Sequence, residues 1–231
     1  MNDYPYVDKL ISKKKIIEIF NEFKNIKYKK NTEDIDKLIK DGFFYLVIWR
    51  KYERLSVITD YFTERCRVVC RFRGQKYTPI EYYTKYKNKV LNECLINKKF
   101  SLQKFRYHMY NTKIQFCNKF NIFIAYLIYD IFKPKSVLDS SAGWGDRLIT
   151  AIAYGCSYTG FDPSECLESK YKDIIKNLAS DPSKYKVIKK PFEEVILTKK
   201  YDIAFTSPPF FDMEDYENSN DQSIKKFPNI N

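Results

Sequence analysis

Apolar and polar positions alternate with helical spacing in the first part of the chain. From residue 13 to 26, isoleucine and phenylalanine return at intervals that place them on one helix face. A second helix is predicted from Pro79 to Ile96, because proline is well suited to the first turn of a helix. The segment 100–132 becomes apolar on nearly all sides and predicts a largely buried helix that leads into Pro134.

Between the first two helices, residues 65–74 read RCRVVCRFRG and alternate basic with apolar side chains over a span that Gly74 closes. Such alternation predicts a short strand with one charged face. That face would carry four arginines: Arg65, Arg67, Arg71 and Arg73. We expect it either to touch nucleic acid or simply to be solvated.

After residue 133 short apolar runs alternate with helical patterns. Strands are predicted at 136–139, 157–162, 185–190 and 201–207, with helices at 146–154 and 165–178. Strands separated by helices of this length predict an α/β fold, a parallel sheet with helices packed on its faces. Four of the six glycines and seven of the nine prolines also lie after residue 133. We therefore expect two parts, a mainly helical region at 1–100 and a sheet domain at 101–231.

Composition limits the class of protein. The 231 residues are 44% apolar, which is enough for a real core, but no apolar run approaches the roughly 20 residues of a membrane span. The first 15 residues contain acids and lysines where a signal peptide has an apolar segment. We expect no membrane partner, no secretion, and a location in the cytoplasm or wherever a nucleic-acid substrate resides.

The positive charge is confined to the first part of the chain. Residues 1–130 hold 27 Lys and Arg against 14 Asp and Glu, a balance of +13, whereas residues 131–231 hold 14 against 15. A basic region of this kind can neutralise phosphates and speed encounter with a polyanion. The alternative is a solvated, lysine-rich surface that reflects biased coding.

The six cysteines lie mostly in apolar or strand-like settings, which suits reduced structural thiols. Cys66, Cys70 and the single histidine, His108, lack a second closely spaced pair of ligands, so we expect no zinc site.

The residues that follow the predicted strands carry the candidate chemistry, because ligands of such sheets bind at the carboxyl ends of the strands. The first strand is followed by DSSAGWGD, in which Gly143 and Gly145 allow a tight turn and close approach to a ligand. A helix that begins with Asp146 is a poor seat for a phosphate. After the second strand, Asp162 stands where an acidic residue accepts hydrogen bonds from ribose hydroxyls.

The third strand is followed by KPFEE, where Phe192 would pack on an adenine face and Glu193 would reach its amino group. Each feature has a plain structural alternative: glycines that form a turn, an aspartate that caps the next helix, and a core phenylalanine. Their order and their positions at successive strand ends favour a nucleoside-like ligand without phosphates.

The motifs DSSAGWG, GFD and TSPPF resemble those of the S-adenosylmethionine-dependent amino-methyltransferases, which methylate exocyclic amino groups of cytosine or adenine. The resemblance covers about residues 101–231 and implies a Rossmann-like sheet. It implies that the loop with Asp139, Ser141, Ala142, Gly143 and Gly145 holds the methionine part of the cofactor, and that Asp162 holds the ribose. Ser140 and Ser141 depart from the usual Pro-Phe of the first motif, and Ser141 removes one apolar contact to the cofactor. A helix at 115–120 would close the methionine pocket.

The loop TSPPFF would be the catalytic loop. Hydrogen bonds accepted from an exocyclic amine make its nitrogen more nucleophilic, and Ser207 Oγ and the Pro208 carbonyl would accept them from a rigid backbone formed by Pro208 and Pro209. Phe210 would stack on a base swung out of a duplex. No metal is required. Serine in this loop favours cytosine N4 over adenine N6, and the substrate is expected to be DNA.

Alternatives remain open at this point. Related loops occur in enzymes acting on RNA or on protein glutamine, and the chain could be a non-catalytic nucleic-acid-binding remnant of such an enzyme. Sheets of this family normally have seven strands, and only four are predicted here before residue 231. We therefore expect a truncated or split chain, or an oligomer or partner chain that completes the sheet at its open edge.

Overall fold

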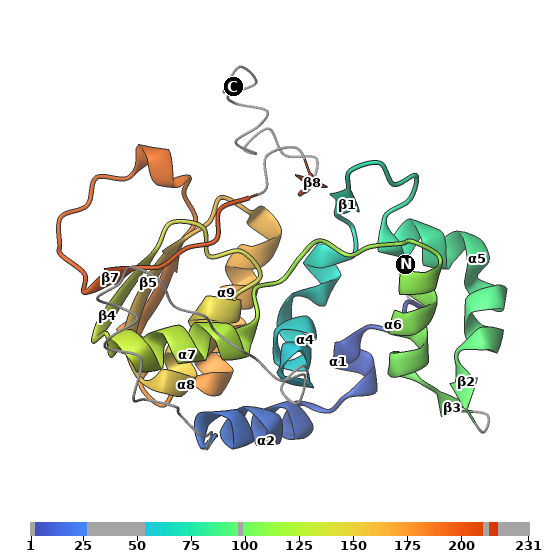
Figure 1. Ribbon diagram of the computed structural model, residues 1–231, viewed down its shortest axis with the longest axis horizontal. Coiled ribbons are helices and arrows are strands. Elements are labelled where there is room, and N and C mark those ends of the chain that lie inside the picture. Colours follow the sequence, from blue (N-terminus) through green and yellow to red (C-terminus); the bar gives the residue numbers. More distant parts are fainter. Residues whose placement is uncertain (1–2, 27–53, 97–98, 210–212, 217–231) are drawn as a thin grey trace, which may run out of the picture.

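The computed structural model describes residues 3–26, 54–96, 99–209 and 213–216. Within these residues the chain is an α/β structure in which a parallel sheet packs beside helices, while a mainly helical part lies next to it (Figure 1). No described helix is long and apolar enough to cross a membrane. Phe210, the predicted stacking residue, lies outside the described residues.

The sheet has four parallel strands, as the sequence pattern predicts, and their order is β6-β5-β4-β7. The strands are β4 (Ser136–Asp139), β5 (Ser157–Phe161), β6 (Tyr185–Ile188) and β7 (Ile203–Ala204). The central strand β4 is paired on both sides, with Asp139 opposite Gly160 of β5 and Leu138 opposite Ala204 of β7. Because all strands run the same way, their carboxyl ends meet at one edge of the sheet.

Three helices lie beside this sheet, α7 (Ile122–Phe132), α8 (Asp146–Tyr154) and α9 (Glu165–Leu178), with α8 packed against both of the others. The helix α7 begins at Asn121, whose side chain accepts hydrogen bonds from the amides of Phe123 and Ile124. The helix α8 is bounded by two glycines with left-handed backbone, Gly145 at φ 90° and Gly155 at φ 94°. Local sequence therefore determines where the helices of the sheet domain begin and end.

The N-terminal part is mainly helical, as expected. Its helices are α1 (Val7–Leu10), α2 (Lys13–Lys24), α4 (Ser56–Arg67), α5 (Pro79–Glu93) and α6 (Leu102–Asn111). Short antiparallel pairs join β1 (Arg71–Phe72) to β8 (Glu214–Asp215) and β2 (Leu95–Ile96) to β3 (Lys99–Phe100). The pairing of β1 with β8 brings the segment after the predicted catalytic loop onto the N-terminal part (Figure 1).

Apolar contacts cross the expected boundary near residue 100 in both directions. One core cluster includes Phe20 of α2 and Ile58 of α4 together with residues of α7, α8 and α9. A second cluster joins Tyr4 and Ile80 to Phe105 of α6. The helices α2 and α4 are thus packed against the sheet domain, whereas α6 is packed against the N-terminal part.

The helix predicted at 79–96 ends at Glu93, and Leu95–Ile96 form the strand β2 instead. Two further predicted elements are wrong. The expected arginine strand is interrupted, because Arg65 and Arg67 belong to the helix α4 and only Arg71–Phe72 is extended in a ladder. The expected continuous helix at 100–132 is two helices, α6 and α7, separated by an irregular segment at 112–121. Asn121 explains the second break, since its cap starts a new helix.

The expectation of six reduced thiols is also corrected. Cys66 of α4 and Cys166 of α9 form a disulfide across a separation of 100 residues, while the other four cysteines are buried free thiols. Cys66 is therefore not available as a metal ligand. The disulfide ties the N-terminal part to the helix that follows β5.

Candidate functional site

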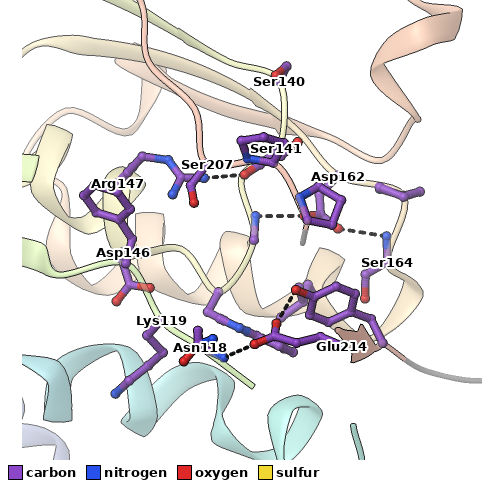
Figure 2. Close-up of a pocket in the computed structure, with 18 of the residues that line it drawn as sticks. Asn118, Lys119, Ser140, Ser141, Asp146, Arg147, Asp162, Ser164, Ser207 and Glu214 are labelled. Carbon is purple, nitrogen blue, oxygen red and sulfur yellow. Dashed lines mark hydrogen bonds between the residues drawn. The ribbon is translucent and has the colours of Figure 1, made fainter. Parts of the chain in front are cut away.

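A cavity of about 690 Å³ lies at the carboxyl edge of the sheet, between the strand ends and the N-terminal part. The loop after each of the four parallel strands supplies lining residues. The lining includes eight of the residues predicted from sequence: Ser141, Gly143, Asp162, Phe192, Glu193, Ser207, Pro208 and Pro209. Figure 2 shows Ser141, Asp162 and Ser207 on one side of this hollow and Asn118, Lys119 and Glu214 on the other. The glycine turn, the acidic residue after β5 and the proline loop therefore converge on one cavity.

The glycine loop after β4 is held to the end of β5. Gly143 has φ 57° and its amide donates to Asp162 Oδ2 over 2.8 Å, while the Ala142 amide donates to the Phe161 carbonyl over 2.8 Å. Gly145 does not line the cavity, and a Cβ there would lie 3.0 Å from the Ile174 Cδ1 atom. Gly143 thus shapes the cavity wall, whereas Gly145 allows α8 to pack against α9.

Asp162 is held by backbone donors and stays partly available to a ligand. Its Oδ2 accepts from Gly143, and its Oδ1 accepts from the Ser164 amide over 3.0 Å. A carboxylate offers about four acceptor sites, so these bonds leave room for donors from a bound molecule. Burial raises the pKa of Asp162 to about 6, although the hydrogen bonds from Ser164 and Gly143 act in the opposite direction.

Asp139, predicted to hold part of the cofactor, does not line the cavity. It is fully buried and accepts hydrogen bonds from Arg147 Nε at 2.7 Å, from the Tyr158 hydroxyl at 2.5 Å and from the Ser141 amide at 3.1 Å. Ala142, which belongs to the same loop, is likewise buried and does not line the cavity. Asp139 therefore fixes the loop and the Arg147 guanidinium from behind and makes no surface of the cavity itself.

The cavity wall at the start of α8 carries charges of both signs. Asp146 and Arg147 both line it, and Figure 2 shows them on the same side as Lys119. Burial raises the pKa of Asp146, against the opposing effects of Lys119 and of the 2.5 Å hydrogen bond from the Thr59 hydroxyl. Burial disfavours the charge of Arg147, yet the adjacent Asp139 carboxylate holds its pKa above the usual value.

The proline loop follows β7, which is an outer strand of the sheet next to the central β4. The Ser140 hydroxyl donates to the Thr206 hydroxyl over 3.2 Å, which joins the ends of β4 and β7. Ser207 is partly buried, and Pro208 and Pro209 are exposed at the rim of the cavity. The predicted acceptor Ser207 is therefore located where the cavity opens.

The segment 213–216 forms a wall that the sequence did not reveal. Glu214 is 2% exposed, and its Oε1 accepts from the Asn118 amide over 2.6 Å, while its Oε2 accepts from the Tyr216 hydroxyl. Tyr216 packs against Trp144 of the glycine loop, with ring centroids 5.9 Å apart. Glu214, Tyr216 and Trp144 all line the cavity, so its far side is aromatic and acidic.

The segment 115–120 was expected to be a helix that closes the pocket. It is irregular, yet Asn118, Lys119 and Phe120 line the cavity, so its predicted position is correct and its predicted conformation is wrong. Phe120 packs edge-on against Phe205, with ring centroids 5.4 Å apart.

Lys119 connects the cavity to a buried ionic network in the N-terminal part. Its Nζ lies 2.8 Å from Asp60 Oδ1, and Asp60 also pairs with Arg67 and Arg106. Burial would raise the pKa of Asp60, but the three cations outweigh it and hold the pKa well below its usual range. Arg106 further pairs with the buried Glu64. The helix α4 thus supports one side of the cavity electrostatically.

The four arginines predicted to share one face lie in different environments. Arg65 pairs with Asp8 at 2.7 Å and stacks over the Tyr6 ring, and Arg67 is buried in the ionic network. Arg71 and Arg73 are exposed, and Arg71 lies 3.7 Å from Glu81. Arg67 is therefore buried and structural, whereas Arg65, Arg71 and Arg73 lie at the surface, with Arg65 engaged by Asp8.

Several lining residues had no signal in the sequence. Trp144 lies inside the glycine motif and was readable as a candidate, whereas Asn118, Lys119, Glu214 and Tyr216 reach the cavity only through tertiary contacts. Among the described residues, no group of three or more His, Cys, Asp or Glu side chains is arranged to hold a metal ion. Comparisons with protein-family models, curated proteins and solved structures found no match to this chain.

Proposed function

We propose that the chain is an S-adenosylmethionine-dependent amino-methyltransferase with a Rossmann-like sheet, acting on an exocyclic amino group of a base in DNA. Cytosine N4 is favoured over adenine N6. The observation that carries the proposal is that the glycine loop, Asp162 and Ser207 line one cavity at the carboxyl edge of a parallel sheet. The resemblance of DSSAGWG, GFD and TSPPF to the family's motifs gives each of these residues its role.

The residues present fit a nucleoside ligand better than a nucleotide. The amide of Gly143, which a phosphate would need, already donates to the Asp162 carboxylate, and Asp146 and Glu193 add negative charge to the lining. Next to Asp162 and Glu193 a phosphate would be disfavoured, whereas ribose hydroxyls would donate to Asp162. Phe192, whose ring lies 5.5 Å from that of Phe161, offers an apolar surface to an adenine.

The amino-acid end of the cofactor is a zwitterion, and the wall at the start of α8 suits one. Asp146 would accept from an ammonium group, and Arg147, fixed by Asp139, would donate to a carboxylate. When bound, S-adenosylmethionine supplies a methyl group on a positively charged sulfur. Asp139 would act as a positioning residue through Arg147.

Ser207 would prepare the target nitrogen for attack. The lone pair of an exocyclic amine is delocalised into its ring, and hydrogen bonds accepted by Ser207 Oγ and the Pro208 carbonyl would draw the nitrogen towards a tetrahedral form. Pro208 and Pro209 fix the backbone of the loop, so these acceptors need no reorganisation. Phe210 would stack on the base once it leaves the helix. The nitrogen would gain the methyl group as the bond from that carbon to sulfur breaks, which leaves a neutral thioether, and the methylated amine would release one proton to water.

The test is a transfer assay with S-adenosylmethionine labelled in its methyl group. DNA and RNA of mixed sequence are offered separately, and the product is digested to nucleosides and separated. Label in N4-methylcytosine from DNA is the expected result. Label in N6-methyladenine or in RNA nucleosides would revise the target, while absence of label from both polymers, with bound cofactor demonstrated, would contradict the proposal.

Phe210→Ala separates stacking from cofactor binding in the same assay. The variant should abolish transfer and leave cofactor affinity nearly unchanged, because its role is confined to the target base. Equal loss of cofactor affinity would contradict the stacking role. Salt-sensitive DNA binding without cofactor affinity would instead identify a non-catalytic nucleic-acid-binding protein.

A further inference from the structure

A second hollow lies outside the cavity, where the loop after β1 meets the start of α5. It measures about 550 Å³ and is lined by Lys76, Tyr77, Ile80, Glu81, Thr84 and Lys85. Lysines and an aromatic ring in one concave surface are the two components of a site for unpaired nucleic acid, which combines phosphate contacts with base stacking.

The tyrosine of this hollow is held in place by the lysines around it. Lys85 Nζ donates to the Tyr77 hydroxyl over 2.6 Å and lies 4.9 Å from the centre of the Tyr77 ring, while Lys76 lies 5.6 Å from that centre. The hydrogen bond from Lys85 lowers the pKa of Tyr77. A ring fixed in this way loses little freedom when a base stacks on it.

A second aromatic ring extends the same surface. Tyr86 is 36% exposed, its ring centroid is 6.3 Å from that of Tyr77, and Lys85 lies 5.5 Å from its centre. The backbone of α5 is non-helical at Tyr86, with φ −113° and ψ 23°. Lys85 therefore makes cation–π contacts with both Tyr77 and Tyr86.

The negative charge in the lining is engaged elsewhere. Glu81 accepts from the Thr78 amide over 2.8 Å in a capping box at the start of α5 and lies 3.7 Å from Arg71. Its carboxylate is thus offset by an arginine and by the helix N-terminus, which leaves the two lysines to face a polyanion.

The hollow adjoins the cavity through a shared ribbon. Arg71, which pairs with Glu81, belongs to β1, and β1 pairs with β8, whose Glu214 lines the cavity. Figure 1 shows β1 and β8 side by side, with the loop after β1 leading to α5. A polynucleotide bound at Tyr77 would therefore follow the β1–β8 pair towards the opening of the cavity.

We propose that the hollow around Tyr77 and Lys85 binds a single-stranded polynucleotide and guides it towards the cavity at the carboxyl edge of the sheet. This inference rests on the proposed function for its biological role. Stacking on Tyr77 and Tyr86 requires exposed base faces, so the site should prefer unpaired strands to duplex.

The test measures binding of a fluorescently labelled single strand to the full chain by anisotropy, without cofactor. Tyr77→Ala should weaken binding about 5- to 100-fold, since it removes one stacking platform, and Tyr77→Phe should retain most of the affinity. The double variant Lys76→Ala/Lys85→Ala should reduce the slope of log K against log salt by about 1.4, because two phosphate contacts are lost.

The matched control is Lys176→Ala/Lys186→Ala, which removes the same charge from exposed positions on α9 and β6. It should change the affinity less than twofold and leave the salt slope nearly unchanged. A control effect equal to that of Lys76→Ala/Lys85→Ala would show unspecific attraction and overturn the site. Circular dichroism checks the fold of each variant. If Tyr77→Ala fails to fold, the affinity and salt slope of Lys76→Ala/Lys85→Ala test the proposal instead.

Duplex DNA of the same sequence and single-stranded RNA form two further arms. Duplex bound as tightly as single strand would overturn the stacking site, and stronger binding of the RNA or the DNA strand identifies the polymer. Because no cofactor is present, loss of strand binding contradicts only this inference. Failure of cofactor binding or methyl transfer, with strand binding intact, would contradict the proposed function alone.

Discussion

The Gly143 amide donates a 2.8 Å hydrogen bond to the Asp162 carboxylate, and this contact joins the loops that follow β4 and β5. The other oxygen of Asp162 accepts from Ser164 at 3.0 Å. One side chain therefore fixes two loops around the cavity and also offers acceptor sites to a ligand. A change in its protonation should affect ligand binding directly.

We expect the affinity for S-adenosylmethionine to fall as the pH is lowered through 6. The pKa of Asp162 is raised to about 6 by burial, and protonation removes acceptor capacity that ribose hydroxyls would use. If only the carboxylate form binds, the dissociation constant should be about tenfold larger near pH 5 than at neutral pH. Titration calorimetry across this range provides the measurement, with circular dichroism as the check of folding.

Asp162→Asn is the control for this pH effect. The variant should bind more weakly at neutral pH by about 10- to 100-fold, as expected for loss of charge-assisted hydrogen bonds, and its affinity should be flat between pH 5 and 7. A pH profile in the variant that matches the wild type would assign the titration to another group, such as Asp146.

Ser207→Ala should lower the rate of methyl transfer by about 100-fold with little change in cofactor affinity. The residue lines the mouth of the cavity, and the proposal gives it contact with the target amine alone. Single-turnover transfer of labelled methyl measures the rate. Ser140→Ala is the matched variant, since Ser140 also lines the cavity but is hydrogen-bonded to Thr206, and an equal loss in both variants would argue against a specific role for Ser207.

Gly145→Ala should destabilise the fold more than Gly155→Ala. Both glycines have positive φ at the ends of α8, so alanine costs about 1–2 kcal/mol of backbone strain at either position. At Gly145 the added Cβ would also lie 3.0 Å from Ile174, whereas at Gly155 nothing lies within 4 Å. Urea unfolding of the two variants measures the difference in the free energy of unfolding. Equal destabilisation would mean that Ile174 of α9 moves away from the added Cβ without loss of stability.

The Cys66–Cys166 disulfide should be detectable by thiol counting. The sequence holds six cysteines, of which four are free, so a thiol reagent in denaturant should find four groups before reduction and six after it. Cys66→Ser/Cys166→Ser should lose about 2–5 kcal/mol of stability and become insensitive to reductant. Six reactive thiols in the unreduced protein would contradict the bond.

The sheet domain was predictable because its signals are local. The four strands, and the helices α8 and α9, follow from apolar runs and helical periodicity, and Pro79 in the first turn of α5 is a local signal of the same kind. The lining residues Gly143, Asp162 and Ser207 were found because each lies in the loop that begins at the end of a parallel strand. Their convergence is a property of parallel strands, which end at one edge.

Other features depend on contacts that no local pattern contains. Arg65 and Arg67 alternate with apolar residues, but both belong to the helix α4, where Arg67 pairs with the buried Asp60 and Arg65 pairs with Asp8 of α1. Asp139 looked like a ligand residue, yet Arg147 and Tyr158 enclose it. Glu214 and Tyr216 reach the cavity only because β8 pairs with β1. The pairing of β1 with β8 joins segments more than 100 residues apart.

Calorimetric titration of the full chain with S-adenosylmethionine tests the central claim most directly. The account predicts one binding site per chain, competition by S-adenosylhomocysteine, and clear weakening in Asp162→Asn, which changes the cavity wall. Absence of binding heat and of competition, or an affinity unchanged by Asp162→Asn, would contradict the claim that this cavity is a cofactor site.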